Sequence, residues 1–577
     1  MTSLIPILAA AGGAAAALLI RWLLEKRNMH IPGVLVYLTF VLPFAAGGFH
    51  SYVAMITVWI LVLDLIRQVR RNRKFRFVFA FPSEAVIFLV LCYCVSPLWA
   101  ADRGMAAFGV VRYLPLVLYM LVLMQYSPEE RKNALLLLPW CGAAMTMVTC
   151  LLLPIPAMQP HITVNGRLAG FFQYPNTFAA FLLAGLVLSQ TKENRQKLDF
   201  LGDAVLIFGI VLSGSRTVFV LLLVALAGIL WLRRSKKLVL SLGITLGAGL
   251  LLALLASQLG LLRNADRFTA ISTSSGSFLV RLLYFKDALP VIARHPFGIG
   301  YLGYRAMEGT FQTGRYGVSF IHNGLLQMLL DVGWAPSVMM AALFLKTMLS
   351  KKTAPGNRLL LFVLLGHCMM DFDLQFFTFW VVLLTVLDFE RGSVHYAKKK
   401  KTLGMGLCAV ILCVCTWLGT GDLLHSLGKN DLCLKVTPFH TDALVTALQT
   451  TADPEELDDL ADRVLKNNPT HALAYSAKAN AAFARGRVVE MMQYKEQAIR
   501  CARYSTEEYV DYYEKLYAVY LRYQGLGDST SAAYCMEKLR TIPELMARVS
   551  EGTDPLARLT GEDQTLRLPE AYLQMLD

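Results

Sequence analysis

Four polar segments of the chain carry side chains suited to phosphate binding or proton transfer. They are residues 165–176 (NGRLAGFFQYPN), residues 213–216 (SGSR), Arg281, and the pair His322-Asn323. Each lies beside a long apolar run, where an ionisable side chain costs free energy to place and therefore indicates a function. Guanidinium groups that converge on one cavity suit a diphosphate, because their planar fork donates two hydrogen bonds to one phosphate and stays charged.

This set of side chains fits the transfer of a sugar from a lipid diphosphate. Negative charge grows on the leaving phosphate as the bond to the sugar C1 breaks, so fixed cations stabilise the transition state more than the ground state. A neutral imidazole at His322 would take or orient the proton of an acceptor hydroxyl, an effect worth ~10²–10⁴-fold in rate. Only Asp371 and Asp373 add acidic groups on the same face. We therefore expect a reaction that needs no metal and no cofactor.

Structural explanations compete with these roles. Arg167 fits equally well as a residue whose guanidinium reaches the lipid headgroups. A lone histidine at a helix start is commonly a core residue, but His322 stands next to Asn323 and ahead of an apolar run, which favours a function. Arg216 lies between two apolar runs on the face where arginine is usually avoided, which again favours a function. Three further arginines fit as solvated loop charges: Arg294, Arg305 and Arg315.

The elements that position these residues are membrane helices. The chain has 577 residues, of which 56% are hydrophobic and 17% charged, and its mean hydropathy is +0.49. A soluble protein could not bury so much apolar surface, so the sequence predicts an all-α, polytopic membrane helix bundle. Apolar runs near ~20 residues give about fourteen spans. Their approximate bounds are residues 4–24, 31–48, 50–66, 84–100, 107–125, 132–153, 176–191, 198–214, 217–232, 237–258, 321–347, 357–371, 373–389 and 402–419.

The basic residues predict the orientation of the bundle. The net charge of +14 comes from short blocks between apolar runs, as in cytoplasmic loops, and does not indicate nucleic acid. With the N-terminus outside, the blocks at 67–76, 233–237, 346–358 and 398–401 all fall inside. This places 154–175, 213–216, 260–320, 371–373 and everything after 420 outside the plasma membrane. The first apolar run has its positive charges behind it, which predicts a retained helix.

The cysteines do not suggest a disulfide framework or a metal site. Most of the eleven lie within apolar runs, where they are expected to pack as small core residues.

We divide the chain into a membrane part, residues 1–420 with an external loop at about 259–321, and a tail, residues 421–577. The tail has a helical pattern in which Tyr475, Ala479, Gly486 and Ala498 follow the offsets of a tetratricopeptide repeat of about 34 residues. A second helix pair is predicted to end at Pro543. Such repeats offer a concave surface for a protein partner. A helical hairpin domain without repeat ancestry is the alternative.

At its polar segments the sequence resembles the O-antigen ligase and surface polysaccharide polymerase family. The resemblance rests on NGRLAGFFQYPN at 165–176, SGSR at 213–216, and the long loop from Arg281 through HPFGIG (295–300) to His322-Asn323, with Gly333 ten residues later. It covers roughly residues 30–390. The ligases of the family carry a small residue or a tyrosine three positions after that glycine. Here that position is Pro336, so the resemblance is to the wider family more than to the lipopolysaccharide ligases.

The resemblance implies roles for the polar residues. Arg216 and Arg281 would bind the donor diphosphate, His322 would activate the acceptor hydroxyl, and the possible pocket residues are Arg167, Asn176 and Asn323. It also implies an undecaprenyl-diphosphate-linked glycan donor, an inverting transfer and no metal. The acceptor would be a glycan, a wall polymer or a protein, and lipid A core is not expected. The enzyme would polymerise or ligate surface polysaccharide at the outer face of the plasma membrane.

Other functions remain open from the sequence. A protein O-oligosaccharyltransferase would use the same chemistry and hold its protein acceptor on the tail. A lipid-linked glycan flippase or transporter also has many spans, but transporters usually carry ionisable residues near the midplane, whereas here the polar groups gather at one face. A non-catalytic scaffold would present the tail to wall-synthesis partners.

Overall fold

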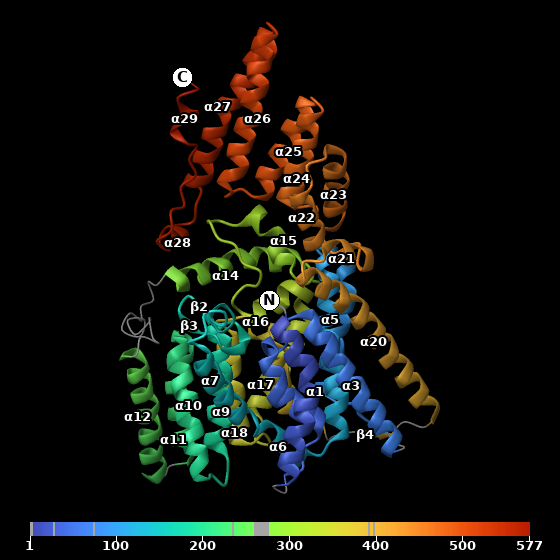
Figure 1. Cartoon of the computed structure of the whole chain (residues 1–577), viewed down its shortest axis with the longest axis vertical. Helices are drawn as coiled ribbons and strands as arrows, with labels where there is room; N and C mark the ends of the chain where they lie inside the picture. The colour runs from blue at the N-terminus through green and yellow to red at the C-terminus, as the bar shows by residue number, and fades with distance from the viewer. Residues whose placement is uncertain are drawn as a thin grey trace.

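The fold is described from a computed structural model, which covers residues 4–26, 29–72, 75–233, 236–258, 276–389, 393–395 and 398–576. Helices dominate, and within these ranges strands form only two short antiparallel pairs, β1 (Arg76–Val78) with β4 (Ser393–His395) and β2 (Thr163–Val164) with β3 (Arg167–Leu168). Figure 1 shows a bundle of helices from the first two thirds of the chain, with the C-terminal helices stacked beyond one end of it. The all-α prediction is confirmed at this level.

Sixteen helices of the described ranges build the bundle. They are α1 (Leu4–Glu25), α2 (Gly33–Val36), α3 (Ser51–Asn72), α4 (Phe81–Val95), α5 (Arg103–Gln125), α6 (Pro128–Leu135), α7 (Leu138–Leu152), α8 (Gln159–Ile162), α9 (Pro175–Thr191), α10 (Lys197–Ser213), α11 (Arg216–Arg233), α12 (Lys236–Gln258), α17 (Trp334–Leu349), α18 (Pro355–Cys368), α19 (Phe377–Thr385) and α20 (Lys398–Ser426). Short turns of π- or 3-10 helix occur at Tyr37–Val41, Leu42–Phe44, Ala46–Gly48, Ser96–Leu98, Gly170–Phe172 and Asp373–Gln375.

Six segments of the described chain are long and apolar enough to cross a membrane. They are Ile5–Glu25, Ser51–Arg71, Phe81–Leu98, Arg103–Gln125, Pro128–Leu152 and Gly404–Ser426. Four shorter apolar helices accompany them: Gly33–Phe44, Arg216–Leu232, Leu242–Leu252 and Trp334–Leu349. These helices support a membrane protein, while the number of about fourteen spans and the inside-outside orientation stay predictions.

The centre of the bundle is α9, which is apolar around its whole circumference. Its residues from Thr177 to Gln190 are buried, and it packs against α7, α10, α11 and α18. A helix that is hydrophobic on every side belongs in the middle of a bundle. Pro175 at its first turn has no N–H to satisfy and fits a helix start. As a result, α9 presents the polar residues Asn176 and Thr177 at one end of a rigid central element.

Two helices and a turn occupy the described part of the predicted external loop. These are α14 (Gly276–Arg294), which carries Arg281, and α15 (Gly303–Phe311). The turn between them lies on the end of α16 (Gly324–Val332), because Ile299 N donates to Leu330 O at 2.6 Å and Gly300 N to Asp331 O at 3.0 Å. A Cβ on Gly298 would lie 2.6 Å from the Asp331 carbonyl, so the close approach needs glycine. Residues 259–275 of the predicted loop lie outside the described residues.

The predicted span at 321–347 is wrong as a single helix. It is divided into α16 and α17 at Gly333, whose φ is +82°. Trp334 N donates to Pro296 O at 3.0 Å. This hydrogen bond to the 295–300 turn replaces the one that a continuous helix would make within itself at this point. With φ +82° and ψ −169°, Gly333 has a conformation that essentially only glycine adopts, and placing a residue with a side chain there costs about 1–3 kcal/mol.

The tail is a stack of helices with its own apolar core. It contains α21 (Asn430–Val436), α22 (Thr441–Thr450), α23 (Pro454–Asn467), α24 (Ala472–Ala484), α25 (Val488–Cys501), α26 (Thr506–Gly525), α27 (Ser529–Glu551), α28 (Pro555–Arg558) and α29 (Glu570–Leu573). Neighbouring helices pack in sequence order, and buried tyrosines of α26 face α27 and the C-terminal segment. This arrangement is of the kind predicted, although repeat ancestry is not shown.

Two boundaries in this region differ from the predicted ones. The helix expected to end at Pro543 continues to Glu551 as α27, because Leu539, Ile542 and Met546 bury one continuous face across the proline. The predicted division at residue 420 falls inside α20, which runs to Ser426. In Figure 1, α20 rises from the β1–β4 pair at the far end of the bundle to the base of the tail.

Candidate active site

The site lies at the end of the bundle that faces the tail, where α9, α14, α16 and the α18–α19 turn meet. Its first element is the start of α9 with the β3 strand before it. Arg167 on β3 donates through Nε to Ser213 O at 2.7 Å and through Nη2 to Asn176 Oδ1 at 2.5 Å. The guanidinium therefore connects two of the predicted segments, 165–176 and 213–216, instead of pointing away toward lipid.

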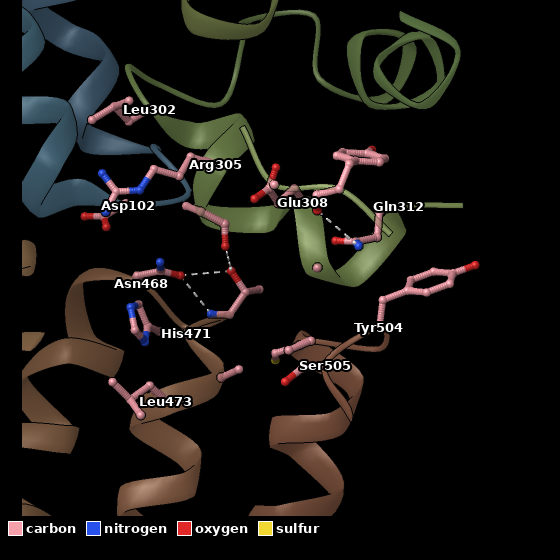
Figure 2. A pocket seen from close by; sticks show the side chains of 18 of the residues that line it. Asp102, Leu302, Arg305, Glu308, Gln312, Asn468, His471, Leu473, Tyr504 and Ser505 are labelled. Atoms are coloured by element: carbon pink, nitrogen blue, oxygen red, sulfur yellow. Dashed lines mark hydrogen bonds between the residues drawn. The ribbon is translucent and has the colours of Figure 1, made fainter. Parts of the chain in front are cut away.

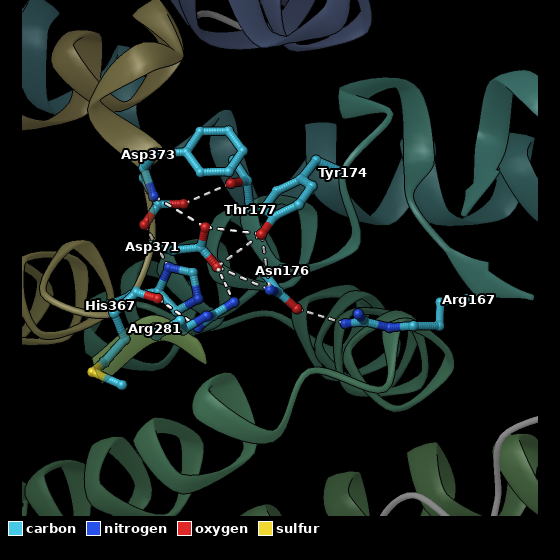
Figure 3. A network of polar contacts seen from close by, with 10 residues as sticks. Arg167, Tyr174, Asn176, Thr177, Arg281, His367, Asp371 and Asp373 are labelled. Atoms are coloured by element: carbon cyan, nitrogen blue, oxygen red, sulfur yellow. Dashed lines mark hydrogen bonds and ion pairs between the residues drawn. The ribbon is translucent and has the colours of Figure 1, made fainter. Parts of the chain in front are cut away.

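Asp371 is the centre of the polar network (Figure 3). This carboxylate is fully buried in the turn between α18 and α19. It accepts from Tyr174 Oη at 3.0 Å, from Asn176 Nδ2 at 2.9 Å and from its neighbour Phe372 N at 3.0 Å. Burial alone would raise the pKa of Asp371, but the Arg281 guanidinium and these donors hold its pKa below the ordinary value. The group is therefore an anion that fixes its neighbours in place.

Arg281 reaches the same carboxylate from α14. Its Nη2 lies 3.3 Å from Asp371 Oδ2, and its Nη1 donates to Met370 O at 2.6 Å. The Arg281 side chain is 16% exposed and that of Asp371 1%. The cation, and not the carboxylate, is thus the partner that a ligand can reach. Asp371 thus contacts Arg281 and Asn176 directly, and Asn176 in turn joins Arg167 to the same network.

A second buried acid continues the network beneath the first. Asp373 accepts from Thr177 Oγ1 at 2.7 Å and lies 2.5 Å from His367 Nδ1 on α18. Both Asp373 and His367 are at most 1% exposed. These contacts tie α18 and the α18–α19 turn to the start of α9, and so support Asp371 from behind.

His322 lies against the α18–α19 turn. Its ring packs against Phe372, with 5.3 Å between ring centroids, and against Tyr284 of α14, with 5.8 Å. Its Nδ1 is buried and makes no hydrogen bond to the part of the chain that the structure describes. Burial lowers the pKa of His322 to about 4, the nearby Asp371 opposes this shift, and Arg281 adds to it. The imidazole is therefore neutral at pH 7, with a nitrogen that has no partner within the described chain.

His322 also lines a cavity of about 410 Å³, which we call the inner cavity. It is bounded by side chains of α5, the α15 region and the turn before α3, among them Phe49, His50, Arg112, Tyr301 and Phe320. Because Nδ1 is buried, a hydroxyl group in this cavity reaches it only when the His322 ring turns toward the cavity. The volume is within the range of about 300–1,000 Å³ typical of small-molecule sites.

Two other predicted residues have different surroundings. Asn323 is the N-cap of α16: its Oδ1 accepts from Leu325 N and Leu326 N at 3.1 and 2.9 Å, and its Nδ2 donates to Met369 O at 3.0 Å. Its amide thus fixes the backbone beside His322. Arg216 is the first residue of α11 and partly buried. It follows the turn at Gly214, whose φ is +59°, and so stands close to the carbonyl that receives Arg167.

Sequence reasoning missed several residues of the site. The sequence pattern gives Asp371 and Asp373 no role beyond acidic groups on the outer face, and nothing in it marks Tyr174, Thr177 or His367. Arg112 was also missed, although it is a lone arginine in an apolar run and lines the inner cavity. Its guanidinium donates to Phe49 O and to Gln375 O and lies over the rings of Phe49 and Tyr301, at 4.8 and 5.5 Å. That isolation within a predicted span was the signal that could have found it.

Comparison with known proteins agrees with the membrane part of this description. No curated protein matches the chain. Residues 201–341 match the family model described as O-antigen ligase. The matched region includes Arg216, Arg281 and His322 and leaves out Arg167, Asn176, Asp371 and the tail. This match supports the O-antigen ligase family for the chain and, with the apolar helices, a membrane enzyme that ligates glycans.

Proposed function

We propose that the protein is a membrane glycosyltransferase that moves a glycan from an undecaprenyl-diphosphate donor to an acceptor hydroxyl at the outer face of the plasma membrane. It would act as a surface polysaccharide polymerase or ligase, with inversion at the sugar C1 and without a metal ion. The observation that carries this proposal is the side chain of His322. His322 lines the inner cavity, its buried Nδ1 has no partner in the described chain, and the charges of Arg281 and Asp371 lie close enough to act on its pKa.

In this proposal the donor diphosphate binds at Arg281 and Arg216, with Arg167 and Asn176 beside them. Arg281 suits the role because Asp371 and Met370 O fix its guanidinium while an edge of it stays exposed. A cation that is already oriented loses little entropy when it binds phosphate, and it stabilises charge as that charge develops. Asp371 balances the cation in the empty site, where an isolated buried guanidinium would be costly.

The proposed reaction is a single displacement. The acceptor oxygen forms a bond to C1 of the donor sugar while the C1–oxygen bond to phosphate breaks. Undecaprenyl diphosphate leaves with the electron pair of that bond. The hydroxyl proton passes to His322, which is neutral because its pKa is low, and then to solvent or to the departing diphosphate. A base with a pKa of about 4 removes the proton only as the new bond makes the hydroxyl acidic, so its first task is to orient the hydroxyl.

The donor itself would strengthen this base. A diphosphate bound at Arg281 adds negative charge near His322 and offsets part of the field of the guanidinium. Both changes favour the imidazolium form, so the pKa of His322 is expected to rise toward neutrality in the complex. The imidazole would then be poised for proton transfer only when donor is present.

The test is a transfer assay with the purified full chain in nanodiscs. The donor would be an undecaprenyl-diphosphate oligosaccharide isolated from cells that make the protein, and products would be sized by gel electrophoresis. A ladder of products identifies a polymerase, and a single shifted acceptor band identifies a ligase. Arg216→Ala and His322→Ala should each abolish most of the product. Full activity in both variants would exclude this site.

The flippase and scaffold functions would give no transfer product in this assay. A flippase would move the lipid-linked glycan across the bilayer without changing its size or consuming the diphosphate bond. A scaffold would do neither, and cells carrying His322→Ala would produce the normal amount of surface glycan.

A further inference from the structure

A second cavity of about 550 Å³, the outer cavity, lies between the external loop and the tail (Figure 2). Side chains of α15 and the following loop line one side, including Glu308 and Gln312. Side chains from the helix junctions of the tail line the other, including Asn468, His471 and Ser505. Figure 2 shows the two sets facing each other across the cavity. The cavity is thus built mainly by two parts of the chain that are more than a hundred residues apart, and Asp102 and Met105 at the start of α5 complete its lining.

Direct contacts hold the two walls together. Thr470 Oγ1 donates to Ala306 O at 2.8 Å, and Arg305 of α15 forms a two-bond ion pair with Asp442 of α22 at 2.7 and 3.2 Å. A Cβ on Gly309 would overlap the Cys501 carbonyl oxygen, so α15 and the end of α25 touch backbone to backbone. Side-chain and backbone contacts therefore hold the tail over the loop, and the residues that make them line the outer cavity.

The outer and inner cavities adjoin. Met105, Leu302 and Arg305 line both of them, so these three side chains stand between the two. The inner cavity then leads to His322. A path from the tail to the imidazole would therefore pass these three side chains.

The charge of the outer cavity selects against a phosphate. Five carboxylates and two guanidinium groups line it, and one of these guanidinium groups, Arg305, is already paired with Asp442. Burial raises the pKa of Glu308 to about 7, so this carboxyl group is partly protonated and uncharged near neutral pH. Carboxylate, amide and hydroxyl oxygens, such as those of Glu507, Gln312 and Ser505, accept hydrogen bonds from hydroxyl groups. The lining fits an uncharged, hydroxyl-rich ligand.

We propose that the outer cavity binds the acceptor, and that the acceptor is the non-reducing end of an uncharged glycan, which the inner cavity then presents to His322. This inference rests on the proposed function and adds where the acceptor binds, what its chemistry is, and that the tail forms half of its site. The two cavities have the volumes of small-molecule pockets. A folded protein acceptor would instead need a surface of about 800 Å² on each partner.

The test uses bulky substitutions that fill the outer cavity from two different helix junctions of the tail. Ala502→Trp and Ala472→Trp place an indole in the lining at the end of α25 and the start of α24. The matched control is Val489→Trp on α25, where the side chain is 67% exposed. Thermal unfolding of each variant would establish that it folds before its kinetics are compared. If one tryptophan variant does not fold, the other still tests the outer cavity.

The kinetic probe separates the two substrates. The donor is the native undecaprenyl-diphosphate oligosaccharide, and the acceptor is the same oligosaccharide released by mild acid and labelled at its reducing end. We expect Ala502→Trp and Ala472→Trp to raise the KM for the labelled acceptor at least about tenfold and to leave the KM for donor unchanged, which is the signature of lost acceptor binding. Val489→Trp should behave like the unmodified chain.

Each of the other possible results would overturn a different part of the proposal. An unchanged acceptor KM in a folded, active variant overturns the assignment of the outer cavity. A raised donor KM would assign that cavity to the donor instead. If the unmodified chain cleaves donor but never extends the labelled oligosaccharide, the acceptor is not a glycan and the inference is overturned. The proposed glycosyl-transfer chemistry would still stand. If the chain does not consume donor at all, the proposed function itself fails.

Discussion

The guanidinium of Arg281 lies 3.3 Å from the carboxylate of Asp371, ninety residues later in the chain, and only the guanidinium keeps an exposed edge. This pair joins α14 to the α18–α19 turn and leaves a fixed cation at the rim of the site. Most of the expected behaviour of the protein depends on that asymmetry.

The first prediction concerns Arg281. Lysine at this position keeps the charge but loses the planar fork that can serve Met370 O, Asp371 and a phosphate together. We expect Arg281→Lys to lower kcat by about 10²–10³-fold, the usual cost of losing one transition-state donor. The matched control is Arg294→Lys in the last turn of the same helix, where the side chain is exposed. Steady-state transfer kinetics would measure both, and a similar loss in both variants would contradict a specific role for Arg281.

The second prediction concerns His322. Removing the imidazole in His322→Ala should reduce kcat by about 10²–10⁴-fold, because the acceptor hydroxyl loses its proton acceptor. His295→Ala, in the turn between α14 and α15, is the matched control and should stay close to the activity of the unmodified chain. If His322→Ala transfers glycan at the normal rate, another group must take the proton.

The third prediction is a difference between two pH profiles. The pKa of His322 in the free protein is about 4, lowered by burial, with Asp371 raising it and Arg281 lowering it further. Protonation removes the base, so kcat/KM should stay constant from pH 7 down to about pH 5 and fall only near pH 4. Bound diphosphate favours the imidazolium, so kcat should begin to fall at a higher pH than kcat/KM does. Identical profiles would show that the donor does not bind near His322.

The fourth prediction tests the network around Asp371. Asp371→Asn keeps the shape of the side chain but leaves Arg281 without its counter-ion, and breaking a buried pair in this way costs about 3–5 kcal/mol. Asn176→Ala removes a donor to the same carboxylate. Because both act on one network, the double variant should differ from the sum of the single losses by about 0.5–3 kcal/mol. Thermal unfolding in nanodiscs would measure this, and simple additivity would argue that the two residues act separately.

The fifth prediction concerns the break between α16 and α17. A Cβ on Gly333 would overlap the Pro296 carbonyl oxygen, and its φ of +82° is unfavourable for alanine. Gly333→Ala should therefore lower the melting temperature and displace the 295–300 turn. Gly243→Ala on α12 is the control, since a Cβ there meets nothing within 4 Å. Equal effects of the two substitutions would mean that the turn does not depend on Gly333.

Much of the architecture could be predicted because it depends on local patterns. The apolar runs indicate the helices, and the polar segments at 165–176, 213–216 and His322 indicate which ends of those helices matter. The helical tail follows from composition. By contrast, the division of the 321–347 run into two helices depends on a contact between Gly333 and Pro296, and the length of α27 depends on side chains that pack on both sides of Pro543. Tertiary contacts decide both.

The candidate site, too, could be predicted only in part from the sequence. Arg167, Asn176, Arg281 and His322 could be chosen because a charged or polar group in such surroundings is costly. Nothing in their spacing reveals that Asp371 contacts two of them, because the connection is made in space between residues 90 and 195 positions apart. The outer cavity could not be foreseen at all, since it exists only where α15 meets the tail.

The single helix α20 enters the tail without a break, and this has a consequence for how the protein could tolerate change in length. Each residue added to an α-helix turns everything after it by about 100° and advances it by about 1.5 Å. One extra residue in α20 would rotate the tail away from α15 and separate Thr470 from Ala306 and Asp442 from Arg305. Insertions of about seven residues, close to two full turns, would restore the angle but lift the tail by about 10 Å. The length and helical phase of α20 therefore determine how far the tail stands from the site and which of its faces meets α15.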